Sequence, residues 1–217
     1  AQGAAADGSL SAAWLRKAID RAQRLREATT FEARKTLLDY DDIIHAQRMA
    51  VYSRRNDILR GADIRPLARQ ALTGAIDALI DRFVPPHGPA DLAGLDQAVR
   101  SELTLAVPFA PGEAGGARDL LRARITAYAE RWLAGKFAAF GEATMDTVLR
   151  RLFLSILDHR WAEQIERLDH LRRVVGDRRL SRSARLPEFK IEAFEAFRLM
   201  MAAFDRDASA YMMRVGI

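Results

Sequence analysis

The sequence predicts an all-α protein with one very long helix, a small group of shorter helices and an antiparallel two-helix hairpin. Residues 9–60 contain neither proline nor glycine, so no strong helix breaker interrupts that stretch. Apolar residues recur there mostly three, four or seven positions apart, which is the spacing of one helix face. No segment shows a convincing strand pattern, and the seven prolines fall in a few clusters.

The first predicted helix covers residues 9–60. Ser9 or Ser11 can cap its start, and Gly61 stands where a helix-ending glycine belongs. At 1.5 Å per residue, such a helix is a rod of roughly 75 Å, longer than a domain of this size is wide. We therefore expect a spine on which other segments rest, or half of a coiled coil. Residues 1–8 do not have the basic and apolar regions of a signal peptide, and we interpret them as a disordered lead-in or a remnant of cloning.

Residues 61–139 are expected to form a second unit of shorter helices. One helix is predicted from Asp63 to Phe83, where two prolines stop it, and a short one from Asp91 to Leu103. The proline- and glycine-rich stretch 107–116 predicts a loop. A helical pattern resumes at Ala117.

Residues 140–217 are predicted to complete the fold as a hairpin. The helical pattern runs on to Val175 with a break near Gly141, and a last helix begins at Pro187, a favourable first helical residue. Its stripe of aromatic residues and methionines is expected to be core, with a groove for apolar peptide segments as the alternative. Two helices joined by about ten residues fold back on each other, which places the connector at the tip of the hairpin.

The connector carries the charge of the protein. Residues 172–190 hold seven basic residues against two acidic ones, a net charge of +5, which equals that of the whole chain. The basic residues are Arg172, Arg173, Arg178, Arg179, Arg182, Arg185 and Lys190.

Sequence motifs for catalysis are absent. There is no glycine-rich phosphate loop, and the lack of cysteine excludes disulfides, thiolate zinc sites and cysteine nucleophiles. The four histidines do not have metal-ligand spacing, and the acidic residues Asp39, Asp41 and Asp42 point in different directions on a helix, so we interpret them as salt-bridging groups. We expect no catalytic, cofactor or metal site in this chain.

One long run of residues resembles the scaffold helix of SecA, the ATP-driven motor of bacterial protein export. The family pattern R-K-x-L-L-x-Y-D-D is followed by a Q-R pair and a Y-x-x-R pair. The matching residues are Arg34, Lys35, Leu37, Leu38, Tyr40, Asp41, Asp42, Gln47, Arg48, Tyr52 and Arg55. Two later runs resemble the family as well, through Leu157, Asp158, Trp161, Leu168, Asp169, Leu171 and Arg172, and then Glu188, Phe189, Lys190, Glu192, Phe194 and Phe197.

The resemblance implies an architecture and a role. Residues 9–60 and 140–217 would form the helical scaffold, 61–139 the helical wing, and the hairpin the two-helix finger. In that family the finger tip contacts the translocating polypeptide near the membrane channel, and the scaffold relays or restrains ATP hydrolysis in motor domains that this chain does not contain. ATP and magnesium are implied only for the parent motor, whose place would be the cytoplasmic face of the bacterial inner membrane.

The resemblance also assigns candidate residues. Docking against motor domains, in cis or in trans, would fall to Arg34, Asp41, Asp42, Arg48 and Tyr52. The tip would contact unfolded preprotein, the translocon channel or anionic lipid through Arg178, Arg179, Leu180, Arg182 and Arg185. Family tips typically carry a glycine and a tyrosine where Arg179 and Leu180 stand here, so an aromatic contact is replaced by positive charge.

Two other functions remain open. An Arg-rich helical protein with a pI of about 9.9 could bind nucleic acid, but a tip without aromatic residues offers no base stacking, so we expect no specific nucleic acid. A coiled-coil adaptor is the third interpretation. Removed from a parent motor, the docking residues would be exposed, and exposed apolar surface predicts a homodimer or poor solubility.

Overall fold

The computed structural model describes residues 12–61, 63–109, 118–178 and 181–216, without the side chains of residues 12, 13, 182 and 183. These ranges contain no strand, and their helices are α1 (Ala12–Arg60), α2 (Arg65–Phe83), α3 (Leu92–Glu102), α4 (Arg118–Phe140), α5 (Glu142–Asp177) and α6 (Arg182–Arg214). The predicted all-α fold class is confirmed. The expected lead-in of residues 1–8 and most of the predicted loop at 107–116 lie outside the described residues.

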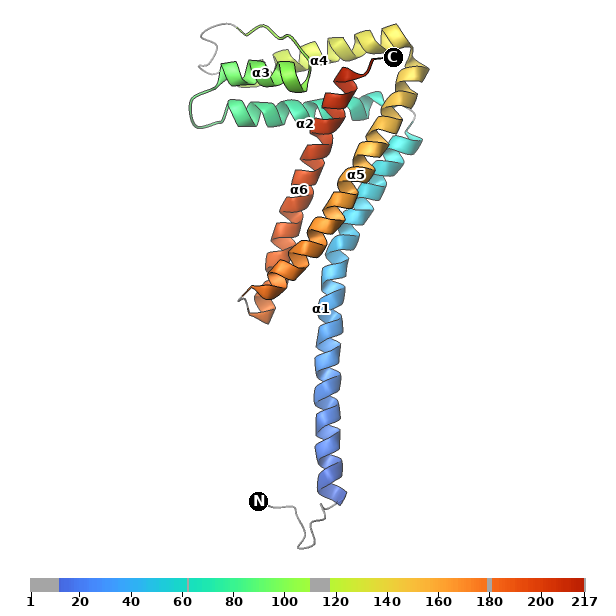
Figure 1. The fold of residues 1–217 in the computed structure, drawn as a ribbon, viewed down its shortest axis with the longest axis vertical. Helices are drawn as coiled ribbons and strands as arrows, with labels where there is room; N and C mark the ends of the chain where they lie inside the picture. The colour runs from blue at the N-terminus through green and yellow to red at the C-terminus, as the bar shows by residue number, and fades with distance from the viewer. Residues whose placement is uncertain (1–11, 62, 110–117, 179–180, 217) are drawn as a thin grey trace.

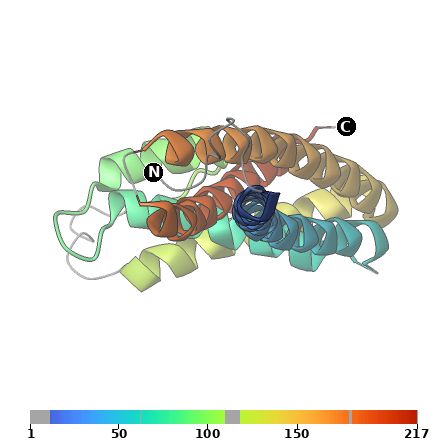
Figure 2. The same ribbon diagram turned by 90° about the horizontal axis from the view of Figure 1, so that it is seen from below.

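Helix α1 is the long axis of the molecule (Figure 1). It has 49 residues, which makes it about 73 Å long. Its buried residues are Tyr40, Gln47, Val51 and Ile58, separated by steps of seven, four and seven, and all of them lie in the C-terminal part of the helix. From below, α1 is seen nearly end-on beside α5 and α6 (Figure 2). Only part of α1 is therefore packed, and the rest extends beyond the hairpin.

Helix α1 ends at Arg60, as the sequence predicts. Gly61 follows it, but the reason that glycine is needed there differs from the left-handed conformation usual at helix ends. Its backbone does not adopt the left-handed conformation. Instead, a Cβ atom at this position would lie 2.6 Å from the carbonyl oxygen of Asp57, so any side chain would clash with the last turn. The Gly61 amide donates a hydrogen bond to that same oxygen at 3.0 Å. Close approach of the backbone is what requires glycine here.

Helices α5 and α6 form the predicted antiparallel hairpin, which lies along the packed part of α1 (Figure 1). Gly141 separates α4 from α5 with a φ of 83°, a conformation that favours glycine. Along the hairpin, the rings of Phe153 and Phe204 meet edge to face with centroids 6.0 Å apart. Burying each ring stabilises the fold by roughly 1.5–3 kcal/mol.

The prediction that Pro187 begins the last helix is wrong. Helix α6 starts at Arg182, and Pro187 lies inside it. Proline has no amide hydrogen, so the carbonyl of Ser183 loses its usual helical partner. The connector is consequently shorter than expected, with only residues 178–181 between the two helices.

Helices α2, α3 and α4 lie across the top of the long helix and the hairpin (Figure 1). Asp63 accepts the backbone N–H of Arg65 at 2.9 Å and so helps to start α2. Asp91 is the N-cap residue of α3, and its side chain accepts the N–H of Gly94 at 2.8 Å. One hydrophobic cluster joins buried residues of all six described helices, so the predicted wing segment shares its core with the scaffold segments. The domain boundaries at 60/61 and 139/140 stay predictions, although both fall at or next to helix ends.

A second, smaller cluster fixes the lower end of the hairpin to α1. Its buried residues are Tyr40, Leu168, Val175, Phe189 and Ala193. The rings of Tyr40 and Phe189 meet edge to face at 4.8 Å. Below this cluster α1 has no neighbour among the described helices (Figure 1).

Candidate functional site

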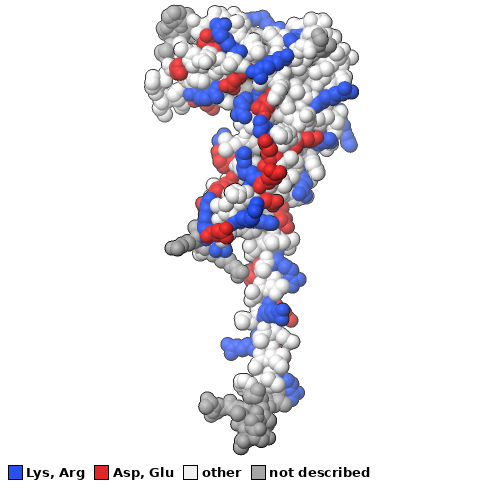
Figure 3. All heavy atoms as spheres, viewed as in Figure 1, with Lys and Arg blue, Asp and Glu red and all other residues white. Residues whose placement is uncertain are grey.

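The hairpin tip is the turn between α5 and α6. Helix α5 ends at Asp177, and Arg178 leaves it in an extended conformation with φ −63° and ψ 145°. Arg179 and Leu180, two of the residues assigned to the tip, lie outside the described residues, as does the side chain of Arg182. Figure 3 shows basic and acidic side chains side by side at this end of the hairpin. The described part of the tip is therefore a mixed surface rather than a purely basic one.

Arg178 accounts for part of this mixing. Its Nη1 lies 3.1 Å from Oε1 of Glu188, and its guanidinium also pairs with the carboxylate of Glu192. The hydrogen bonds to Glu192 raise the pKa of Arg178. Glu188 and Glu192 are one turn apart on α6, so both can pair with Arg178. These ion pairs hold the end of α5 against α6. Arg178 is thus charge-compensated within the chain.

Arg185 is placed differently. Its half-buried side chain lines a hollow of about 320 Å³ between the tip and α1, together with Leu37, Tyr40 and Arg172. Its Nε is buried and has no hydrogen-bond acceptor among the described residues. Arg172 is only 3.9 Å from the carboxylate of Asp41. Arg185 therefore lies beside α1 with one buried donor unpaired, whereas Arg172 forms an ion pair with Asp41 of α1.

The five residues assigned to docking are all exposed. They are Arg34, Asp41, Asp42, Arg48 and Tyr52. Asp41, Asp42 and Arg48 line a polar groove of about 580 Å³ between α1 and α5. Arg34 lies on the extending half of α1, and Tyr52 lies higher on the helix, so the structure brings only three of the five together. Their role in docking stays a prediction.

The extending half of α1 has an unusual surface. Every described side chain from Trp14 to Lys35 is exposed. Several are large and apolar, including Leu25 at 71% and Phe31 at 63% exposure. An isolated helix is stabilised mainly by packing of its apolar face, and contiguous apolar surface on a soluble chain marks an interaction site. This half of α1, which we call the free half (residues 14–35), is uncovered by the other described helices.

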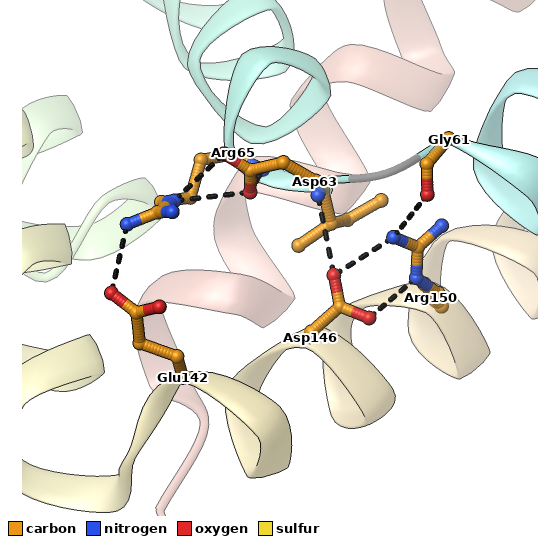
Figure 4. Close-up of polar contacts among 7 residues, drawn as sticks. Gly61, Asp63, Arg65, Glu142, Asp146 and Arg150 are labelled. Carbon is orange, nitrogen blue, oxygen red and sulfur yellow. Dashed lines mark hydrogen bonds and ion pairs between the residues drawn. The ribbon is translucent and has the colours of Figure 1, made fainter.

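A polar joint connects α1, α2 and α5 at the top of the molecule. In Figure 4, Arg150 and Asp146 of α5 point toward the turn between α1 and α2. Arg150 donates hydrogen bonds to the carbonyls of Ile58 and Gly61, the latter at 2.7 Å. These carbonyls belong to the end of α1, where no intrahelical donor remains.

Asp146 completes the joint. It accepts the N–H of Ile64 at 3.3 Å and the Nε of Arg150 at 2.6 Å. The hydrogen bond from Arg150 lowers the pKa of Asp146. Beside this pair, Arg65 bridges Asp63 and Glu142 across the same corner (Figure 4). Sequence reasoning missed this joint, although the four-residue spacing of Asp146 and Arg150 on one helix face was an available signal.

An apolar groove lies between α1 and α6. It has a volume of about 370 Å³, and its walls include Ile43, Ala46, Phe194 and Phe197. Phe194 is 67% exposed, whereas Phe189, Phe204, Met200 and Met212 of the same helix are buried. The aromatic and methionine stripe of α6 is therefore core for the most part, as expected, whereas Phe194 and Tyr211, which is 55% exposed, face outward.

The described residues offer no metal centre, since no group of three or more histidine and carboxylate side chains converges. All four histidines are exposed. None of the described helices is both long and apolar enough to cross a bilayer. The arrangement can bind and position partners through helix surfaces.

Comparison with known proteins agrees with the motifs. Residues 9–216 match the family model of the SecA wing and scaffold domain. The chain is 44% identical over 214 residues to the protein translocase subunit SecA 2 of Rhodopseudomonas palustris strain BisA53. That alignment covers 98% of this chain but 26% of the relative, so the chain spans about a quarter of the relative's length. The matched region contains the long helix, the short helices that cross it and the hairpin. The chain belongs to the SecA wing and scaffold domain family.

Proposed function

We propose that this chain is the helical scaffold and wing of a SecA-type protein-export motor. The free half of α1 carries this proposal, because a helix with exposed residues such as Leu25 and Phe31 needs a partner to cover it. The relative is about four times longer, so a longer polypeptide of this family has segments available for that surface. The motor segments are the occupants we propose.

Docking would use charge as well as apolar area. Asp41, Asp42 and Arg48 line the polar groove next to the free half, and Arg34 projects from it. Such charged groups set register and orientation between partners, while buried apolar side chains supply most of the affinity. ATP and magnesium would be bound by the motor segments. This chain would relay or restrain their hydrolysis through α1 and the polar joint.

The hairpin would act as the finger of the motor. Its tip would contact translocating polypeptide, the translocon channel or an anionic membrane at the cytoplasmic face. Leu180 stands in the family's substrate-contact position, and Arg179, Arg182 and Arg185 would supply charge. The two carboxylates on Arg178 suit a positioning role better than a contact role for that residue.

The docking proposal can be tested by mixing this chain with the segments of the SecA 2 relative that lie outside the matched region, expressed separately, and measuring affinity by calorimetry. Leu25→Asp places a charge in the free half, where it should weaken binding by at least about tenfold, since a buried unpaired charge is costly. The matched control is Leu120→Asp on α4, because Leu120 is 68% exposed and lies away from α1.

Either of two results would contradict this proposal. Equal affinities for the two variants would show that the free half is not the docking surface. Self-association of this chain that Leu25→Asp abolishes, without binding to motor segments, would favour the coiled-coil adaptor instead.

A further inference from the structure

Arg54 of α1 lies where α1, α2 and α6 meet, and its side chain is only 13% exposed. Its Nη1 donates a hydrogen bond to Oε1 of Gln70 in α2 at 2.6 Å. Its Nη2 lies 3.9 Å from Oδ1 of Asp205 in α6, which is beyond the range of a hydrogen bond. One arginine therefore stands between acceptors on two different helices and is bonded to only one of them.

The contact with Asp205 leaves two complementary groups unsatisfied. Nε of Arg54 and Oδ1 of Asp205 are both buried, and neither has a hydrogen-bond partner among the described residues. A buried polar group without a partner is costly, and more so when it is charged. The guanidinium carbon of Arg54 already lies 5.6 Å from the ring centre of Phe204, the residue before Asp205. A shift of about 1 Å would bring Nη2 within hydrogen-bond range of Oδ1, so a side-chain movement is enough to close the pair.

Arg54 is the cation available to Asp205. The other charged residues next to this point on α1, α2 and α6 already have ionic partners. They form three sets of ion pairs, namely Arg55 with Asp158, Asp77 with Arg122, and Arg160 and Arg206 with Asp207. The charge of Arg54 is also the one that acts on the pKa of Asp205, by opposing the effect of burial.

The ionisation of Asp205 decides which acceptor suits Arg54 better. A carboxylate forms a charge-assisted hydrogen bond with arginine, which is about twice as strong as a bond between neutral groups, and a neutral carboxyl group loses that advantage over the amide of Gln70. With Arg54 on Gln70, burial raises the pKa of Asp205 to about 6, so both forms of Asp205 are populated within about one unit of that pH. The side chain of Asp205 is 22% exposed, which gives the proton a path to water.

We propose that Arg54 changes partner when Asp205 ionises. It stays on Gln70 of α2 while Asp205 is neutral, and it moves onto Asp205 of α6 once that carboxylate is charged. Gln70 is exposed and can bond to water when Arg54 leaves it. The long helix is thus tied to α2 in mild acid and to α6 at higher pH. This switch does not depend on what covers the free half of α1.

The test follows the full chain by NMR from about pH 4.5 to about pH 8, through the carboxyl carbon of Asp205, the Nε–H of Arg54 and the side-chain amide of Gln70. All three signals should change with one midpoint. Gln70→Ala removes the competing acceptor, so Arg54 should close on Asp205 and lower its midpoint by about one pH unit, the tenfold effect of one charge-assisted hydrogen bond. Gln97→Ala is the matched control, because Gln97 is an exposed glutamine of α3, and it should leave the midpoint unchanged.

A second variant removes the ionisation itself. Asp205→Asn keeps the size of the side chain, so the signals of Arg54 and Gln70 should no longer respond to pH and Arg54 should remain on Gln70. If this variant does not fold, Gln70→Ala still decides, since it changes an exposed side chain. A midpoint that Gln70→Ala leaves unchanged, or a titration of Asp205 during which the signals of Arg54 and Gln70 stay constant, would overturn the proposal.

Discussion

The carboxylate of Asp205 in α6 lies 3.9 Å from the guanidinium of Arg54 in α1, with no hydrogen bond between them. Gly74 of α2 closes the other side, because a Cβ atom there would lie 2.6 Å from Oδ2 of Asp205. Asp205 is thus enclosed where three helices meet. Burial raises the pKa of Asp205 to about 6, and the nearby charge of Arg54 only partly opposes that rise.

Asp205 should make the protein more stable in mild acid. Its pKa is about 6 in the folded chain against 3.8 for an ordinary aspartate, so the folded state binds the proton more tightly. Stability from this group therefore rises as the pH falls from 7 toward 4, by an amount on the order of 3 kcal/mol. Urea denaturation at pH 7.5 and pH 5 should show about half of this gain, because pH 5 is only one unit below the pKa of the folded state, and Asp205→Asn should remove it. A pH response identical in the two proteins would contradict the assignment.

Gly74→Ala should destabilise the fold, although alanine normally favours a helix. The new methyl group would lie 2.6 Å from Oδ2 and 3.2 Å from Cβ of Asp205, so the whole side chain would have to move. We expect a loss of about 1–3 kcal/mol, the usual cost of overpacking. A double-mutant cycle with Asp205→Ala should recover most of the loss. Equal losses with and without Asp205 would show that the steric conflict lies elsewhere.

Replacing Arg150 with methionine should loosen the joint between α1 and α2. The variant removes donors to the carbonyls of Ile58 and Gly61 and leaves Asp146 without its cation. The expected loss in the free energy of unfolding is about 2 kcal/mol, since these are hydrogen bonds to a charged group. Amide exchange of Ile64, which donates to Asp146, should also become faster. Arg151→Met, at an exposed neighbouring position, is the control and should change neither quantity.

Removing different arginines of the tip should weaken membrane binding to different extents. Arg182→Ala with Arg185→Ala should weaken co-sedimentation with anionic vesicles, by about 1 kcal/mol per arginine. Arg178→Ala should change vesicle binding less, because Glu188 and Glu192 already compensate its charge. The double variant of Arg60 and Arg151, two exposed arginines away from the tip, is the matched control. If the tip pair behaved like this control, the charged-tip hypothesis would be wrong.

The sequence predicted the elements that depend on local patterns. The long helix followed from the absence of proline and glycine before Gly61, and the break before α5 from Gly141. The start of α6 was mistaken because proline favours the first turn of helices, whereas Pro187 is tolerated five residues further in. Phe189, which follows Pro187 in the same helix, packs against Tyr40, a contact between residues far apart in the sequence.

The polar contacts could not be predicted in the same way. Gln47 was recognised as a family position, but its hydrogen bonds to Ala193 and Gln164 exist only when three helices are assembled. Arg178 looked like a free cation in sequence, and its partners emerged because the turn of α6 brings Glu188 and Glu192 to it. Charge counting gives a net value for a segment, whereas folding decides which charges remain available.

Helix α1 is clamped at one end only, between Tyr40 and Ile58, and its free half continues as a stiff rod of about 30 Å. If the scaffold relays changes to a partner, such a rod would act as a lever with its fulcrum at the small cluster around Tyr40 and Phe189. A tilt of about 10° at the fulcrum would carry the far end through roughly 5 Å, about the pitch of one helical turn. Small rearrangements among buried side chains at one end would then be converted into displacements as large as a side chain at the other.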